Sequence, residues 1–280
     1  MIYKIALLVF GTWTFLNFSI ASAEQLSADT SILDFKLAMT KDLVEKSAEQ
    51  QFPESHLTKL PVIITLGTYK KEATAGIVFD ALPNGTDRTK ILYNPNQNSS
   101  DIFAISRDLN YGGSGTILVK TLHDSLLEKY GKPLKISESG GYMVLIWASN
   151  PATYNASCAP EAAPYRPYFY EDVYAANALD ARPIDSQRDE TSRGFVNFLN
   201  RLDRHDPKLI ARAKCGIILT ITVRARVGAS SEYAYEMRET LVDLTKGAAA
   251  LEIFHSDLTA GADREKKTKI LQDSESKPKL

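Results

Sequence analysis

The sequence predicts an α+β fold of two modules, each a helix followed by an antiparallel sheet, with a long insertion interrupting the second module. Two observations predict this fold. A helical pattern followed by short apolar runs occurs once before residue 111 and begins again after the Gly-rich run at residues 112–116. A long alternating segment at residues 215–227 is typical of an antiparallel strand with one buried face. We therefore expect a first module at residues 24–111 and a second at residues 112–258.

The first 23 residues have the pattern of an export signal. A positive residue, Lys4, precedes an apolar run, and Ala21-Ser22-Ala23 is the small-x-small pattern that signal peptidases recognise. An uncleaved membrane anchor is the alternative, although polar residues interrupt a run that is already short for a membrane span. Because no cysteine follows the cleavage pattern to receive a lipid, we expect a soluble mature chain that begins at Glu24 and is periplasmic or secreted.

The composition is that of an ordinary globular protein, and it limits the classes of partner. Of the 280 residues, 44% are hydrophobic and 24% are charged, and the formal net charge is −1. A chain so close to neutral lacks the positive field that binds nucleic acid or an anionic membrane. No apolar run after the signal approaches the ~20 residues that a spanning helix needs. We therefore expect no nucleic-acid partner and no stable membrane insertion.

The first module is predicted to begin with a helix and to continue with strands. Thr40 suits the N-cap of the helix, and apolar residues recur every four positions from Val44 to Phe52. Pro53 then ends the helix. Four short apolar runs, separated by loops rich in turn-forming residues, indicate strands. These runs are residues 62–66, 75–81, 89–93 and 102–106.

The second module also begins with a helix, which we expect to open at Thr116. Leucines at every fourth position form the apolar stripe of this helix. Gly131 suits the position just after the last turn, where a left-handed backbone conformation is common, and Pro133 cannot continue the helix.

The remainder of the second module contains two predicted strands on either side of the insertion. The strands are residues 142–148 and 215–227, and the insertion occupies about residues 150–214. After Tyr233 the apolar pattern favours a strand and then a helix. The tail at residues 259–280 is polar and mixed in charge, which predicts disorder.

Two cysteines, Cys158 and Cys215, stand near the two ends of the insertion. An even number of cysteines in an exported chain is typical of a disulfide. A redox pair or a metal site is the alternative, but neither cysteine lies in a C-x-x-C motif or within a few residues of a histidine. We therefore predict a structural disulfide, and we assign no metal ion, cofactor or catalytic residue from the sequence.

An aromatic segment of the insertion is the candidate binding surface. Five aromatic residues and an arginine lie within ten positions, close to prolines that favour an extended chain. Tyrosine and arginine are enriched where protein surfaces bind partners, and aromatic rings also stack on sugars. The alternative is that these rings pack inward as a small core of the insertion. The candidate residues are Tyr165, Arg166, Tyr168, Phe169, Tyr170 and Tyr174.

Two short motifs resemble those of known envelope proteins. Residues 35–40 (FKLAMT), followed by a helix that ends at Phe52, are similar to the opening of the BamE/OmlA-like outer-membrane assembly lipoproteins and of the beta-lactamase inhibitor proteins. Residues 127–133 (LEKYGKP) are similar to a helix end in tandem versions of such exported bacterial modules. The chain differs in having Ala38 where the pattern prefers glycine, in lacking a lipid-attachment cysteine and in its long insertion. The resemblance implies helix-plus-sheet modules that bind other proteins, and it brings no catalytic residue.

These observations favour an exported, non-enzymatic binding or assembly-assisting protein of the bacterial envelope, whose partner is another envelope protein. The alternative is an envelope hydrolase that acts on cell wall or saccharide through residues that the fold alone brings together. A cleft with two or more buried Asp, Glu or His side chains would favour the hydrolase. A secreted effector or inhibitor differs from the first hypothesis in its partner alone.

Overall fold

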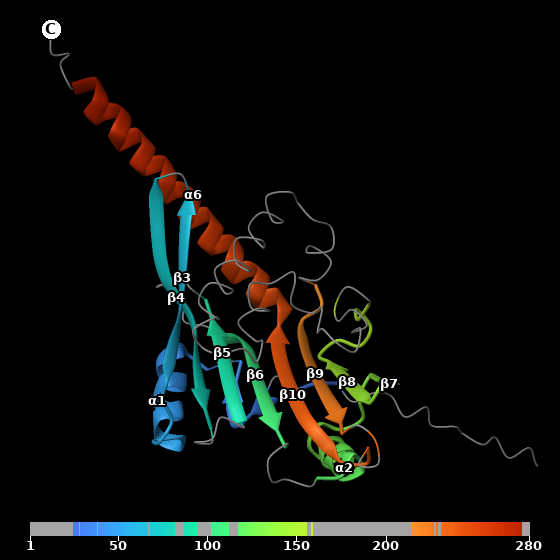
Figure 1. Cartoon of the computed structure of the whole chain (residues 1–280). Helices are drawn as coiled ribbons and strands as arrows, with labels where there is room; N and C mark the ends of the chain where they lie inside the picture. Colours follow the sequence, from blue (N-terminus) through green and yellow to red (C-terminus); the bar gives the residue numbers. More distant parts are fainter. Residues whose placement is uncertain are drawn as a thin grey trace, which may run out of the picture.

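The structure is a computed structural model that describes residues 25–275 except residues 28, 38, 67, 82–86, 95–101, 112–116, 156–157, 159–213, 227 and 229–230. It has an α+β fold, as the sequence predicts, with an eight-stranded antiparallel sheet at its centre (Figure 1). The elements in chain order are β1 (Ser31–Ile32), β2 (Phe35–Lys36), α1 (Lys41–Gln51), β3 (Thr58–Leu66), β4 (Tyr69–Asp80), β5 (Asp87–Tyr93), β6 (Ile102–Asn110), α2 (Val119–Tyr130), β7 (Lys135–Ser139), β8 (Tyr142–Ala148), β9 (Ile217–Ala225), β10 (Ala234–Asp243) and α6 (Leu244–Glu275). The strand order across the sheet is β3-β4-β5-β6-β10-β9-β8-β7.

Each half of the sheet repeats one arrangement, a helix followed by four strands. In the first half α1 precedes β3 to β6, and in the second half α2 precedes β7 to β10. The halves meet where β6 pairs with β10, so one sheet runs through both. The sequence pattern misses the small β1–β2 hairpin and β7, whose sequence KISES is too polar to show an apolar alternation. Both β7 and β3 are edge strands, and β3 contains Pro61, which has no N–H to donate to a neighbour.

The two helices α1 and α2 and the N-terminal segment, residues 25–37, pack against one face of the sheet. Thr40 caps α1 as predicted, because its side chain accepts a hydrogen bond from a backbone N–H of the first turn. Gly131 ends α2 with a φ of 71°, a left-handed conformation that favours glycine. Ile32 and Phe35 of the N-terminal segment are fully buried in the core on this face.

Helix α6 crosses the opposite face of the sheet and continues past its edge (Figure 1). Phe254 and Leu258, in the first half of the helix, are buried in the core on that face. Residues 266–274 are exposed. Although α6 has 32 residues, none of the helices that the structure describes is both long and apolar enough to cross a membrane.

The extent of α6 differs from the disordered tail that the composition of residues 259–280 predicts. The helix continues to Glu275. Acidic residues four positions before lysines, such as Glu265 before Lys269, stabilise a helix, and composition alone does not register this spacing. The first half of α6 is already helical because it packs against the sheet. The polar half can therefore extend this helix without a separate, unfavourable nucleation step.

A glycine in α6 lets the β3–β4 hairpin pack closely against the helix. A Cβ atom placed on Gly261 would lie 2.4 Å from Cζ of Tyr69, so the ring lies directly over helix backbone. Lys71 of the same hairpin forms an ion pair with Asp257, with 3.6 Å between Nζ and Oδ2. The hairpin and α6 therefore support each other where both extend beyond the rest of the sheet (Figure 1).

We expect Gly261→Ala to destabilise the protein, although alanine in a helix interior is normally about 1 kcal/mol more favourable than glycine. The added Cβ would displace the Tyr69 ring from the helix. In a Tyr69→Ala background the same substitution should instead stabilise the protein by about 1 kcal/mol. Urea unfolding of the wild type, the two single variants and the double variant measures both effects. Equal effects of Gly261→Ala in the two backgrounds would contradict this contact.

A disulfide joins Cys158 to Cys215, as the sequence predicts, with an S–S distance of 2.09 Å. Cys158 follows β8, and Cys215 lies two residues before β9. Both cysteines are buried in the core on the α6 face. The bond therefore fixes the points at which the insertion leaves and re-enters the fold.

Candidate functional site

The aromatic segment predicted as a binding surface lies outside the described residues. The Gly-rich run at residues 112–116 and His205 also lie outside them. In the part of the chain that the structure describes, candidate functional side chains gather in a partly exposed patch on one face of the sheet and in a buried network on the other. The residues of the aromatic segment therefore remain predicted partner contacts: Tyr165, Arg166, Tyr168, Phe169, Tyr170 and Tyr174.

The partly exposed patch consists of Tyr142, Arg224, Tyr235 and Glu236 and is called the arginine patch below. Tyr142 and Glu236 are the cross-strand neighbours of Arg224, so these three side chains point to the same face. The guanidinium carbon of Arg224 lies 5.7 Å from the ring centre of Tyr142 and 5.1 Å from that of Tyr235. Nη1 of Arg224 lies 3.9 Å from Oε2 of Glu236. Two rings and a carboxylate thus position a cation whose side chain is 39% exposed.

A β-bulge brings Tyr235 into the arginine patch. The register of β10 against β9 shifts between Ala234 and Glu236, which leaves Tyr235 as the extra residue. The backbone of Tyr235 is fixed, because its carbonyl oxygen accepts a hydrogen bond of 2.8 Å from the N–H of Tyr111. The patch therefore stands on paired strands, on the face that α6 crosses and at the end of β10 opposite the start of α6.

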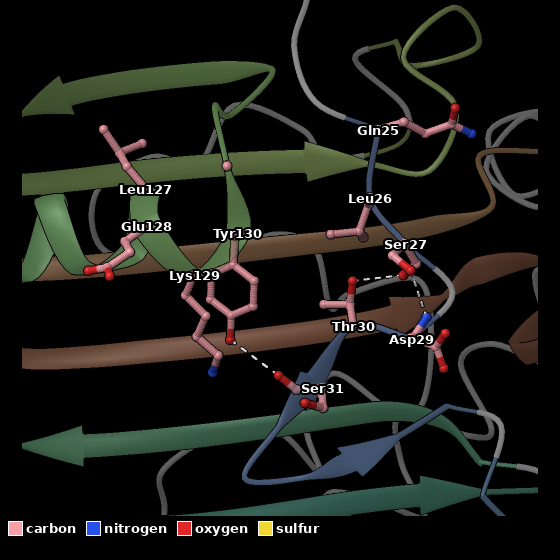
Figure 2. Close-up of a pocket in the computed structure, with 11 residues that line it drawn as sticks. Gln25, Leu26, Ser27, Asp29, Thr30, Ser31, Leu127, Glu128, Lys129 and Tyr130 are labelled. Carbon is pink, nitrogen blue, oxygen red and sulfur yellow. Dashed lines mark hydrogen bonds between the residues drawn. The ribbon is translucent and has the colours of Figure 1, made fainter.

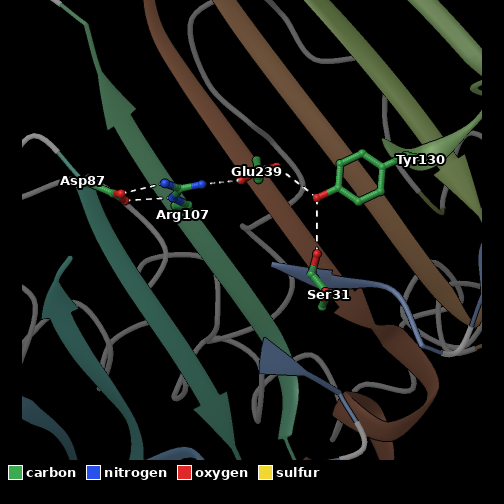
Figure 3. Close-up of polar contacts among 5 residues, drawn as sticks. All are labelled: Ser31, Asp87, Arg107, Tyr130 and Glu239. Carbon is green, nitrogen blue, oxygen red and sulfur yellow. Dashed lines mark hydrogen bonds and ion pairs between the residues drawn. The ribbon is translucent and has the colours of Figure 1, made fainter. Parts of the chain in front are cut away.

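The buried network lies on the other face and connects the two halves of the sheet (Figure 3). Arg107 of β6 donates two hydrogen bonds to Asp87 of β5, at 2.9 and 2.7 Å. Nη1 of Arg107 lies 3.5 Å from Oε2 of Glu239 on β10. The Tyr130 hydroxyl, at the end of α2, lies 3.1 Å from Oε1 of Glu239 and 3.3 Å from the carbonyl oxygen of Ser31. Strands of the first half are thereby joined to a strand and a helix of the second.

Burial makes the charges of this network depend on one another. Asp87 and Glu239 are 4% and 2% exposed, so Arg107 has to compensate two carboxylates that water does not reach. Burial lowers the pKa of Arg107, but the hydrogen bonds and charge of Asp87 and the charge of Glu239 raise it above its ordinary value. Burial also raises the pKa of Tyr130 well above its ordinary range, and the charge of Glu239 and its hydrogen bond add to this effect. Tyr130 is therefore a neutral donor.

Tyr130 should remain neutral in the folded protein near pH 10, where free tyrosine ionises. We expect wild type and Tyr130→Phe to give the same tyrosinate absorbance while folded, up to about pH 11. In guanidinium the variant should show one ionising tyrosine fewer. Because the unfolded chain ionises first, the stability that Tyr130 contributes is complete below about pH 10 and is lost as the pH rises above it. A difference between the folded titration curves would contradict a neutral Tyr130.

An open cleft of about 450 Å³ lies beside the network, between the N-terminal segment and the end of α2 (Figure 2). Tyr130 lines this cleft and also contacts Glu239. Polar groups of the N-terminal segment bond to one another: Thr30 Oγ1 donates to the Ser27 carbonyl oxygen at 2.7 Å, and the Asp29 N–H donates to Ser27 Oγ at 3.1 Å. The residues that line the cleft are Gln25, Leu26, Ser27, Asp29, Thr30, Ser31, Leu127, Glu128, Lys129, Tyr130 and Gly131.

The lining of the cleft includes two carboxyl groups, those of Asp29 and Glu128, and neither belongs to the buried network. Acid–base catalysis needs a side chain that exchanges a proton beside space for the substrate. Asp87 and Glu239 are buried carboxylates, but both face the guanidinium of Arg107, and neither lines the cleft. Within the ranges that the structure describes, no three His, Cys, Asp or Glu side chains converge as metal ligands. The arginine patch contains arginine and tyrosine, which are residue types enriched among the residues that contribute most to protein–protein binding.

Comparison with models of protein families, with characterised proteins and with solved structures finds no match for this chain. A functional proposal therefore depends on the fold and on the geometry of the arginine patch. Sequence reasoning missed this patch because its residues come from three strands. The alternation of residues 215–227 did place Arg224 on the polar face of its strand, but the residues beside it depend on the pairing of β8 and β10.

Proposed function

We propose that the chain is an exported, non-enzymatic binding or assembly-assisting protein of the bacterial envelope, and that the arginine patch contacts its partner. The observation that supports this proposal best is Arg224, a partly exposed cation that lies 5.7 and 5.1 Å from the centres of two tyrosine rings on paired strands. Arginine and tyrosine are enriched among the residues that contribute most to protein–protein binding. Side chains that are already held in position lose little conformational entropy on binding.

The fold and the disulfide support the remaining parts of the proposal. The repeat of a helix followed by four strands agrees with tandem modules of the BamE/OmlA-like and beta-lactamase-inhibitor type, and we propose that relationship on this basis. The pair Cys158–Cys215 and the predicted export signal favour an oxidising compartment, either the periplasm or the exterior of the cell. The aromatic segment of the insertion is a second contact surface within the same proposal.

The double substitution Tyr142→Ala with Tyr235→Ala should reduce capture of the partner from envelope extract at least about tenfold, because hot-spot residues contribute about 2 kcal/mol or more each. Cross-linking to the immobilised protein, followed by quantitative mass spectrometry, measures the capture. Leu43→Ala is the matched control, since Leu43 is 47% exposed on α1, on the other face, and its loss should leave capture unchanged. Tyr168→Ala with Tyr170→Ala tests the aromatic segment in the same assay. Equal capture by wild type and the Tyr142/Tyr235 variant would contradict the proposed role of the patch.

A further inference from the structure

We propose that the β1–β2 hairpin is a releasable latch over the junction of the two halves of the sheet. The hairpin opens as a unit while the eight-stranded sheet stays folded, and its opening brings water to Tyr130 and Glu239. This inference goes beyond the proposed function and does not depend on it. The observations that carry it are the position of the hairpin over the buried network, its pairing and the conformation of its turn.

The hairpin lies where the two halves of the sheet meet. Strand β1 contacts both β6 and β10, and β2 contacts β6. The side chains of Ile32 and Phe35 are fully buried in the core on this face. The Tyr130 hydroxyl lies 3.3 Å from the carbonyl oxygen of Ser31 and 3.1 Å from Oε1 of Glu239 (Figure 3). The hairpin therefore covers the buried network at its Tyr130 end.

The pairing of the hairpin allows it to open separately from the sheet. Strands β1 and β2 pair with each other as a two-stranded sheet, whereas β6 and β10 have a strand neighbour on both sides within the eight-stranded sheet. The ion pair of Lys36 with Asp29 lies within the N-terminal segment, so it can move with the hairpin. Release of the hairpin therefore breaks no hydrogen bond between strands of the large sheet, which is the condition for a local opening.

The turn of the hairpin has a backbone conformation that opposes closure. Leu33 and Asp34, its two central residues, have φ values of 50° and 66°, and this left-handed region costs free energy for most residues with a side chain. The two-residue turn between β7 and β8 has φ values of 58° and 82°, but glycine occupies both positions, Gly140 and Gly141. Strain in the hairpin turn favours the open state, and burial of the two apolar side chains of the hairpin opposes it.

Native-state hydrogen exchange of the chain from residue 24, at increasing urea below the unfolding transition, tests the latch. We expect the protected amides of residues 31–36 to exchange at least about tenfold faster than those of β6 and β10. Their rates should also depend less on urea, because a local opening exposes less surface than unfolding does. Equal rates and equal urea dependence in hairpin and sheet would overturn the inference.

The variant Gly141→Val separates local opening of the hairpin from unfolding of the whole chain. A Cβ atom on Gly141 meets nothing within 4 Å, so the substitution strains the β7–β8 turn without a clash. Exchange in β6 and β10 should become at least about fivefold faster, because the folded chain is destabilised relative to the unfolded one. Exchange of residues 31–36 should keep its wild-type rate, since the β7–β8 turn stays intact when the latch opens. An equal acceleration in the hairpin would show that it opens only with the whole fold.

Substitutions of Asp34 test the strain, because this side chain is exposed and both variants remove the same charge. Asp34→Gly should slow exchange of residues 31–36 about threefold, and Asp34→Val should accelerate it at least about fivefold. Nitration of Tyr130 by tetranitromethane, located by mass spectrometry, should be fastest in Asp34→Val and slowest in Asp34→Gly. Hairpin exchange that ignores Asp34 would exclude the strained turn, and nitration that ignores it would exclude the uncovering of Tyr130.

Discussion

Replacing Cys158 and Cys215 together with alanine should lower the free energy of unfolding by about 4 kcal/mol. The disulfide closes a loop whose ends are 57 residues apart, and the chain-entropy model gives this value for a loop of that length. Removing both sulfurs avoids an unpaired buried thiol, so the measured loss reports the bond and two small packing changes.

Guanidinium unfolding of the chain from residue 24, followed by the fluorescence of Trp147, measures this loss. Trp147 is the single tryptophan of that chain, and it is fully buried on β8. A reductant should move the wild type to the midpoint of the double variant and leave the variant unchanged. A loss below about 1 kcal/mol would mean that other contacts already hold the two ends of the insertion together.

Arg107→Met should destabilise the fold by about 3–5 kcal/mol, because it removes the cation that compensates two buried carboxylates. Methionine fills much of the same volume, so the loss comes from the uncompensated charges of Asp87 and Glu239. The same fluorescence-detected unfolding measures it. Adding Asp87→Asn and Glu239→Gln to Arg107→Met should recover a large part of the loss, since no buried charge then remains.

The control for the Arg107 experiment is an exposed ion pair. The side chains of Lys120 and Asp124 on α2 are 84% and 54% exposed, so Lys120→Met should leave the unfolding midpoint nearly unchanged. If Arg107→Met were as mild as Lys120→Met, water would have to reach the network, and the connection between the two halves of the sheet would not depend on it.

Most of the fold could be predicted from local sequence patterns, because helix caps and helix ends depend on residues that are close together in the sequence. The cap at Thr40 and the glycine after α2 are such patterns, and both have the predicted role. The edge strand β7 could not be predicted in this way, because an exposed edge needs no apolar alternation. The tail that continues α6 was missed for a related reason: its stability comes from charge spacing and from the packed helix before it, and the composition shows neither.

The candidate site was less predictable, because it depends on how distant strands pair. The disulfide followed from the number of cysteines and the predicted export signal, so it needed no knowledge of the fold. The arginine patch needs the register of β10 against β9, and a shift by one residue would move Glu236 to the other face. The bulge at Tyr235 has no signature in the apolar pattern. The charged network likewise joins Asp87 to Glu239 through a strand pairing that spans both halves.

The N-terminal segment is synthesised early but can dock only late. The Leu26 N–H donates to the carbonyl oxygen of Ala148 at 3.3 Å, and the carbonyl of Ser31 lies against a tyrosine 99 residues further along the chain. At a ribosomal rate of ~5–20 residues per second, the leading end therefore waits on the order of 10 seconds for the surface that will cover it. During that interval the N-terminal segment lacks its native contacts with α2 and β10, although Phe35 can already contact Phe79. The finished fold thus leaves a short apolar stretch near the leading end without part of its native cover while the later strands are still being made.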